Sequence, residues 1–281
     1  MERIWIAGAG TMGSGICLVF ARAGAFVRLY DVREEIVSSA LTRLARELDR
    51  QVEKGRLSRR EADETMGRIV GSASVADAAD ADFVLEAVTE DAALKKSLFA
   101  ELNDICGPDC VFLSNTSSVP ITEMAWASGR PDRFAGMHFF NPAPVMRLVE
   151  VICALGTSDA TRDAVLDLAR RLGKTPVTVQ DSPGFVVNRI LTPMINEAVG
   201  LLAEGVASAE DIDRAMCLGA NHPMGPLALA DLVGCDVVVT ISDIFVKETG
   251  DSRYAAHPLL RKMVRAGKLG RKTGEGFYRY E

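Results

Sequence analysis

A glycine-rich turn between a strand and a helix constrains this chain more than any other feature. Residues 3–7 are apolar and strand-like, residues 8–13 read GAGTMG, and residues 14–23 have a helical pattern. A second strand is expected over residues 26–30, and Asp31 follows it directly. Glycines in a G-x-G-x-x-G pattern allow a tight turn, close approach of the backbone to a pyrophosphate, and close packing of helix on strand. The pattern therefore predicts a dinucleotide-binding βαβ unit.

The cofactor-binding residues predicted in this unit surround the glycine turn. Free N–H groups at the start of the helix would bind the phosphates. Asp31 should accept hydrogen bonds from the adenosine ribose and repel a 2′-phosphate, which favours NAD over NADP. Arg33 weakens that preference because an arginine can receive the phosphate, so NADP stays an alternative. The predicted residues are Gly8, Gly10, Thr11, Met12, Gly13 and Asp31.

Strands and helices alternate through the first two thirds of the chain. Further strand-like runs lie at 68–71, 83–87, 111–114, 133–139, 148–152 and 176–179. This alternation predicts an α/β fold with a doubly wound, mostly parallel sheet of Rossmann type. A long amphipathic helix is expected over residues 33–54, and its far end is basic between residues 50 and 60.

The pattern becomes helical after Ser182 and Pro183, which suit a helix cap and a first helical turn. The predicted domains are residues 1–182, which bind NAD, and residues 183–281, a smaller all-helical domain of a kind that commonly buries apolar positions against another subunit. Helices are expected at 184–204, 208–217, 226–248 and 258–266.

Charge and cysteine content narrow the class of protein. A net charge of −6 argues against a nucleic-acid partner, so an anionic small molecule would need a local basic patch. The six cysteines form no disulfide framework and no zinc quartet, which predicts free thiols in a cytoplasmic protein without a metal site. Glycines interrupt the uncharged run 4–21, so we expect neither a signal peptide nor a membrane anchor.

The segment 134–152, FAGMHFFNPAPVMRLVEVI, places one histidine and one carboxylate among apolar residues. If the chain reverses about Pro144, His138 lies opposite Glu150 in an antiparallel ladder, within side-chain reach. A carboxylate beside a histidine fixes its tautomer and favours its protonated form, as a general base requires. The alternative is a core histidine in a purely structural hydrogen bond.

Two other segments offer candidate substrate contacts. SNTSS (114–118) directly follows an apolar strand, and ligands of such sheets bind outside the carboxyl ends of strands, so Ser117 or Ser118 could donate to a substrate oxygen. A turn or helix cap before Pro120 would explain the same residues. In SPGFVVNRIL (182–191), Asn188 lies early in a helix and could reach a substrate, although most helical asparagines are merely solvated.

Taken in order and spacing, GAGTMG, SNTSS, GMHFFNP with VEVI, DSPGFVVNR, HPMGP and GRKTGEGFY resemble the 3-hydroxyacyl-CoA dehydrogenases. The likeness is strongest to the bacterial 3-hydroxybutyryl-CoA dehydrogenases and covers essentially the whole chain. It implies NAD as the cofactor, an acyl-CoA substrate and a homodimer formed through the helical domain.

The resemblance also implies roles for individual residues. His138 would be the catalytic base with Glu150 as its orienting partner, and Ser117 would bind the 3-hydroxyl. Asn188 would complete the catalytic and substrate-binding set, and Lys54 is the best match for a residue near the CoA 3′-phosphate. The implied cofactor contacts outside the glycine turn are Glu90, Lys95, Ser117 and Lys272.

Two other functions stay open on the sequence alone. An enzyme of the same architecture could oxidise another 3-hydroxy acid, such as a sugar acid or carnitine, and would not need the thioester. A dinucleotide-binding or structural protein could keep the fold without activity, although the complete set of Ser117, His138, Glu150 and Asn188 argues against it.

Overall fold

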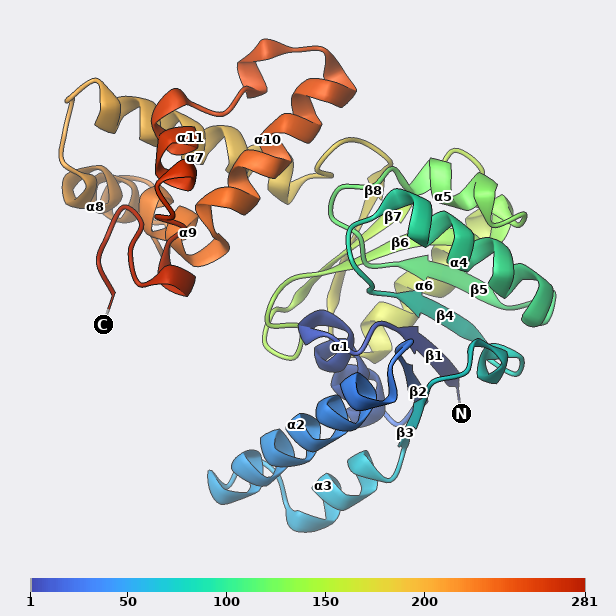
Figure 1. Cartoon of the computed structure of the whole chain (residues 1–281). Coiled ribbons are helices and arrows are strands. Elements are labelled where there is room, and N and C mark those ends of the chain that lie inside the picture. The colour runs from blue at the N-terminus through green and yellow to red at the C-terminus, as the bar shows by residue number, and fades with distance from the viewer. Residues whose placement is uncertain (1, 281) are drawn as a thin grey trace. The chain divides into compact units, whose positions relative to one another are not determined.

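The computed structural model describes residues 2–280, which form two compact units that divide between Ser182 and Pro183. The first unit is α/β and the second is built of helices (Figure 1). The predicted fold class, a doubly wound and mostly parallel sheet followed by a helical domain, is confirmed.

The sheet of the first unit has eight strands among the described residues, in the order β3-β2-β1-β4-β5-β6-β7-β8. Neighbouring strands are parallel except β6 and β7, which form an antiparallel pair. The strands are β1 Arg3–Ala7, β2 Phe26–Tyr30, β3 Ile69–Ser72, β4 Phe83–Glu86, β5 Val111–Ser114, β6 Phe134–Phe139, β7 Leu148–Cys153 and β8 Thr175–Gln180. The carboxyl ends of β1 to β6 therefore lie at one edge of the sheet.

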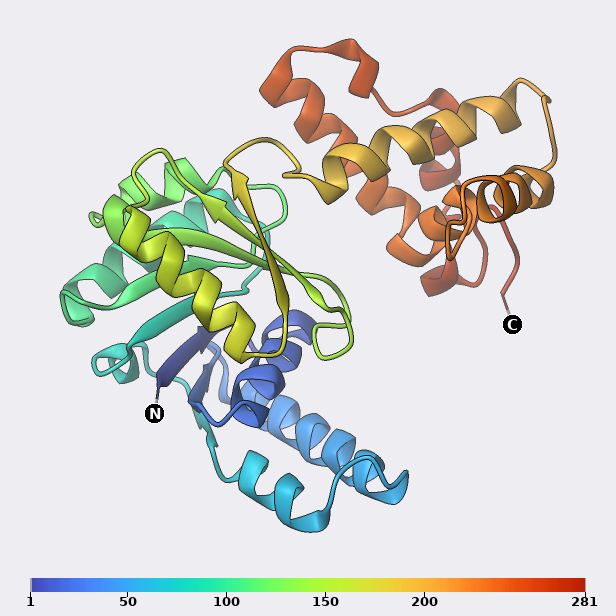
Figure 2. The same cartoon turned by 180° about the vertical axis from the view of Figure 1, so that it is seen from behind.

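Helices cover both faces of this sheet (Figures 1 and 2). Helices α1, α2 and α6 share one apolar core with the strands, which includes Ile16, Leu44 and Leu168. On the other face, Phe99 of α4 stacks edge-on against Phe134 with ring centroids 4.7 Å apart. The helices of this unit are α1 Thr11–Arg22, α2 Glu34–Glu53, α3 Arg59–Met66, α4 Ala92–Ile105, α5 Ile121–Ala127 and α6 Asp159–Arg171.

Helix α3 lies in a segment where the sequence pattern indicates only the basic end of the preceding helix. Ser58 and Glu61 form a reciprocal capping box that starts this helix. The basic residues are largely paired: Arg59 Nη1 lies 2.8 Å from Asp49 Oδ1, and Arg50 Nη2 lies 2.6 Å from Glu47 Oε2. The segment 50–60 is therefore less of an open cationic patch than its sequence indicates.

The second unit corrects two of the predicted helix boundaries. The first helix begins at Val187 rather than next to Pro183, because Gly184 and Phe185 have positive φ values of 75° and 52°. The single helix expected over 226–248 is two helices, broken at Gly234 with a φ of 106°. The helices are α7 Val187–Ala203, α8 Ala209–Gly219, α9 Pro226–Val233, α10 Cys235–Thr249 and α11 Pro258–Arg265.

Buried acids tie the end of the second unit together. The carboxylate of Asp231 accepts hydrogen bonds from the backbone N–H groups of Phe277 and Tyr278, both at 2.9 Å. Asp213 accepts from the hydroxyl of Tyr278 at 2.8 Å. Within the part of the chain that the structure describes, no helix combines the length and the apolar character needed to cross a bilayer.

Candidate active site

The glycine turn between β1 and α1 has the backbone geometry that its sequence predicts. Gly8 has a φ of 97°, and its N–H donates to the carbonyl of Tyr30 at 2.8 Å. A Cβ on Gly13 would lie 1.8 Å from the carbonyl oxygen of Gly8, so only glycine lets α1 start this close to the turn. The N–H of Ala9 donates to Asp31 Oδ2 at 3.0 Å, which ties the turn to the end of β2.

A cavity of about 660 Å³ opens on this turn. Asp31 lies on its wall, and apolar side chains make up much of the rest. Five of the six residues predicted around the turn line this cavity: Gly8, Gly10, Thr11, Met12 and Asp31. The sixth, Gly13, lies beneath the turn as a packing residue.

These residues fit a dinucleotide. A Cβ added at Gly10 would meet no protein atom within 4 Å, so the backbone here faces open space that a pyrophosphate could enter. The N-terminus of α1 has no side-chain cap, which leaves its first N–H groups directed at that space. Arg33 also lines the cavity.

The end of β4 carries a buried carboxylate that the sequence analysis missed. Glu86 accepts from Lys95 Nζ at 2.6 Å and from Ser114 Oγ at 2.6 Å, and both charged side chains are at most 1% exposed. Burial outweighs these partners and raises the pKa of the Glu86 carboxyl. The sequence signal for this buried pair is an acid at the end of an apolar strand, followed nine residues later by a lysine near the start of a helix.

Glu90 connects this buried pair to the SNTSS segment. Its carboxylate accepts from the Ser117 N–H at 2.8 Å, from the Ser117 hydroxyl at 3.2 Å and from the Thr116 hydroxyl at 2.9 Å. Lys95 Nζ lies 3.0 Å from the same carboxylate. Burial acts to raise the pKa of Glu90, but the Lys95 charge and these hydrogen bonds outweigh it and lower the pKa. The structure thus brings Glu90, Lys95 and Ser117 into one network.

His138 and Glu150 occupy the register that the sequence predicts. The two residues are direct partners in the antiparallel β6–β7 ladder. His138 Nδ1 lies 2.8 Å from Glu150 Oε2, and both residues are buried. The Phe140 ring packs against the imidazole with centroids 4.6 Å apart. The histidine is therefore held by a hydrogen bond on one side and by an aromatic ring.

A second residue missed in the sequence joins the ends of β5 and β6. Asn115 Oδ1 accepts from the Phe139 N–H at 2.8 Å, directly after His138. Its own N–H donates to the Glu86 carbonyl at 2.8 Å. Asn115 therefore fixes the strand end that carries His138 to the segment that carries Ser117.

Three predicted residues are not among these groups. Lys54 is exposed at the end of α2, and this helix of 20 residues puts it about 30 Å from the end that borders the cavity. Asn188 and Lys272 belong to the second unit. Asn188 is the second residue of α7, and Lys272 Nζ binds Asp236 of α10 at 2.6 Å.

The strand–turn–helix cradle and the polar groups at the carboxyl edge of the sheet define an NAD-binding oxidoreductase of Rossmann type. Two family models match the chain: "3-hydroxyacyl-CoA dehydrogenase, NAD binding domain" over residues 3–182, and "3-hydroxyacyl-CoA dehydrogenase, C-terminal domain" over residues 184–280. The chain belongs to the 3-hydroxyacyl-CoA dehydrogenase family.

Individual relatives match along their whole length. The chain is 51% identical to a probable 3-hydroxybutyryl-CoA dehydrogenase of Bacillus subtilis, over 100% of this chain and 98% of that protein. It is 50% identical to a 3-hydroxybutyryl-CoA dehydrogenase of Clostridioides difficile, over 99% of each. The crystal structure of an (S)-3-hydroxybutyryl-CoA dehydrogenase from Ralstonia eutropha is similar with a TM-score of 0.97 and 47% identity, and covers 100% of this chain and 99% of that chain.

Proposed function

We propose that this chain catalyses the reversible, NAD-dependent oxidation of (S)-3-hydroxybutyryl-CoA to acetoacetyl-CoA, with His138 and Glu150 as its general-base pair. The observation that carries the proposal is the buried 2.8 Å hydrogen bond between His138 Nδ1 and Glu150 Oε2 in the same unit as the dinucleotide cavity. The names of the Bacillus and Clostridioides relatives support the four-carbon acyl group.

Glu150 determines which ring nitrogen of His138 can act as the base. As a carboxylate it accepts the N–H at Nδ1, so the neutral imidazole carries its lone pair at Nε2. We assign to Nε2 the removal of the 3-hydroxyl proton. The imidazolium formed in that step is stabilised by the adjacent negative charge of Glu150, and base catalysis of this kind contributes roughly 10²–10⁴-fold in rate. NAD, when bound, supplies the hydride acceptor.

Ser117 is assigned to the substrate oxygen. Its hydroxyl donates to Glu90 at 3.2 Å, and a substrate oxygen that develops negative charge is a competing acceptor of the same type. Glu90 and Lys95 then hold the Ser117 backbone in place whichever acceptor its hydroxyl uses, because the Ser117 N–H also binds Glu90. From the second unit we assign Asn188 to the substrate and Lys272 to the cofactor, and in the first unit Lys54 to the CoA 3′-phosphate.

We also infer a homodimer formed through the helical unit and a cytoplasmic location. Large apolar side chains are exposed on several of its helices, among them Ile190, Leu218 and Leu232 at 63%, 80% and 50%. All six cysteines are free thiols, as a reducing compartment favours. Light scattering coupled to gel filtration tests the dimer, and a monomer at micromolar concentration would contradict it.

The deciding assay follows nicotinamide absorbance during reduction of acetoacetyl-CoA, with NADH and NADPH compared in parallel. A longer 3-ketoacyl-CoA and free acetoacetate serve as matched substrates that change only chain length or the thioester. We expect fast oxidation of NADH with the four-carbon thioester and little with free acetoacetate. Equal turnover of free acetoacetate would overturn the CoA-thioester assignment.

A further inference from the structure

A second cavity of the first unit lies at the opposite end of α1 from the glycine turn. It measures about 410 Å³ and shares no lining residue with the dinucleotide cavity. Val19 and Arg22 of α1 line it, whereas Gly10 and Thr11 border the other cavity. Because α1 has 12 residues, the two ends are about 18 Å apart.

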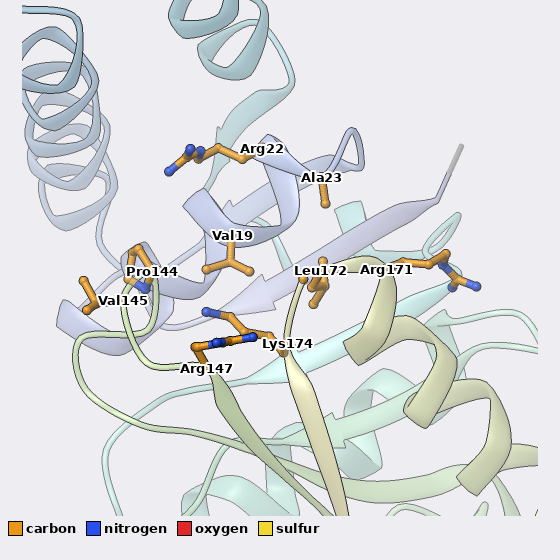
Figure 3. Close-up of a pocket in the computed structure, with 10 residues that line it drawn as sticks. Val19, Arg22, Ala23, Pro144, Val145, Arg147, Arg171, Leu172 and Lys174 are labelled. Carbon is orange, nitrogen blue, oxygen red and sulfur yellow. The ribbon is translucent and has the colours of Figure 1, made fainter. Parts of the chain in front are cut away.

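Basic side chains from three separate segments line this cavity, and no acidic residue among the described residues 2–280 does. Arg22 ends α1, Arg147 precedes β7, and Lys174 precedes β8. Arg147 and Lys174 are neighbours because the residues that follow them, Leu148 and Thr175, are partners in the sheet. Figure 3 shows both side chains below Val19, and Arg22 above the α1 ribbon with its side chain extended sideways. A fourth cation, Arg171, points away in the same view and pairs with Glu2.

Lys174 is built into this cavity rather than lying on its surface. It is only 9% exposed, and its Nζ donates to the carbonyls of Ala143 at 2.6 Å and Met146 at 2.8 Å. Burial, followed by the repulsion of Arg22, lowers the pKa of this ammonium. Arg22 and Lys174 are therefore close enough to repel each other, in a chain whose net charge is −6.

The positive charge exceeds what the neighbouring protein groups balance. The C-termini of α1 and α6 border the cavity, and each carries roughly half a negative charge. The Glu61 carboxylate interacts with Arg22, although hydrogen bonds from Ser58 are the main reason that the Glu61 pKa is lowered. With Arg171 paired and the Glu61 charge counted, the three cations Arg22, Arg147 and Lys174 leave an excess of about one positive charge.

We propose that this cavity binds a small organic phosphate. A positive excess suits a phosphate or diphosphate group, which arginine side chains bind through several N–H donors at once. The volume exceeds that of a bare phosphate and lies in the range of ligand pockets, roughly 300–1,000 Å³. Val19, Leu172 and Pro144 supply an apolar wall for the organic part. The site is distinct from the residues assigned to catalysis.

The test is calorimetric titration of inorganic pyrophosphate into the NADH-saturated protein at constant ionic strength. Saturation with NADH fills the glycine turn, which would itself bind the probe. We expect saturable binding whose dissociation constant rises about tenfold in Arg147→Gln and in Arg22→Gln, the loss of one charge-assisted contact. Both arginines are exposed, so neither substitution should disturb folding.

Arg170→Gln is the matched control. Arg170 lies beside Arg171 in the last turn of α6. It is exposed and pairs with Asp167 at 2.6 Å, but it does not line the cavity. Absence of saturable heat, or an equal loss of affinity in Arg170→Gln, would overturn the proposal and leave these cations as partners of the two helix ends.

Addition of coenzyme A then distinguishes two sources of the phosphate. If coenzyme A displaces pyrophosphate, and Arg147→Gln weakens coenzyme A binding equally, the cavity holds the nucleotide end of that molecule and the assignment of Lys54 to it is wrong. If pyrophosphate binding is unchanged by saturating coenzyme A, the ligand is a separate organic phosphate.

Discussion

Lys95 Nζ lies 2.6 Å from Glu86 Oε1, and both side chains are withdrawn almost completely from water. Such a pair costs much desolvation, and its geometry and further hydrogen bonds must offset that cost. Here Ser114 and the Val88 N–H bind the carboxylate as well, and Lys95 continues to Glu90. The pair therefore supports the network that holds Ser117.

Removing one member of the Lys95–Glu86 pair should cost more stability than removing both. Lys95→Met leaves the Glu86 carboxylate buried without its cation, and we expect a loss of about 3–5 kcal/mol in the free energy of unfolding. In the double variant Lys95→Met, Glu86→Gln much of that loss should return, because no uncompensated charge stays buried. Urea unfolding of the wild-type chain, the single variants Lys95→Met and Glu86→Gln, and the double variant gives the coupling free energy between the two side chains. Additive losses would show that the two side chains do not depend on each other.

An added methyl group should affect stability at one glycine of the turn and NADH binding at the other. In Gly13→Ala the new Cβ would meet the Gly8 carbonyl at 1.8 Å, and we expect a destabilisation of about 3 kcal/mol. In Gly10→Ala it would meet no protein atom, so stability should change by less than about 0.5 kcal/mol. That methyl would instead occupy the space expected for the pyrophosphate, and the NADH dissociation constant should rise at least about tenfold.

Thermal unfolding and fluorescence titration with NADH check this pair of glycine variants. Native NADH affinity in Gly10→Ala would place the phosphates elsewhere. Native stability in Gly13→Ala would mean that α1 can move away from the turn at little cost.

The sequence predicted the register of β6 and β7 because both strands are apolar and a proline-containing reversal fixes their centre near Pro144. It did not predict the break at Gly234, because the apolar pattern runs through α9 and α10 and only the local packing against Asp236 and Lys272 marks this position. Local periodicity reports burial, but a single residue with positive φ leaves that periodicity intact.

The missing members of the candidate site have a similar explanation. The sequence pattern does not predict the role of Glu86, because that role depends on partners far along the chain. These partners are Lys95 on α4 and Ser114 on β5. Asn115 acts through a backbone contact to Phe139 that depends on the order of the strands. His138 and Glu150 were found because their contact lies within one hairpin, where spacing alone determines pairing.

Cofactor preference should depend on the charge of Asp31. Asp31→Asn keeps an oxygen that can accept from the Ala9 N–H but removes the negative charge that opposes a 2′-phosphate. With Arg33 on the same cavity wall, we expect the ratio of kcat/KM for NADPH over NADH to rise about tenfold or more. Adding Arg33→Gln should cancel most of that gain. An unchanged ratio in Asp31→Asn would mean that the Asp31 charge does not determine the preference for NADH over NADPH.

Ser117→Ala tests whether the hydroxyl that donates to Glu90 also serves the substrate. The Ser117 N–H bond to Glu90 survives the substitution, so the loop should stay in place. We expect kcat to fall about 10²-fold, the lower end of what one donor to a developing oxyanion contributes. Ser118→Ala is the control on the adjacent residue and should keep near-native turnover. Equal effects of the two substitutions on kcat and on unfolding would indicate a structural role only.

The His138–Glu150 pair is tested most sharply by changing each member while keeping its shape. His138→Gln should retain NADH binding and lose turnover by about 10²–10⁴-fold, because the proton acceptor is gone. Glu150→Gln keeps an oxygen near Nδ1 but removes the negative charge that stabilises the imidazolium, so it should lower kcat less.

Substrate affinity and stability separate this role of Glu150 from simple packing. Loss of the charge that stabilises the imidazolium acts on the chemical step, so Glu150→Gln should lower kcat with little change in the KM for the acyl-CoA or in the free energy of unfolding. A variant that only loosens the β6–β7 hairpin would lose stability together with activity. If His138→Gln turns over at a near-native rate, the base must be sought elsewhere along the carboxyl edge of the sheet.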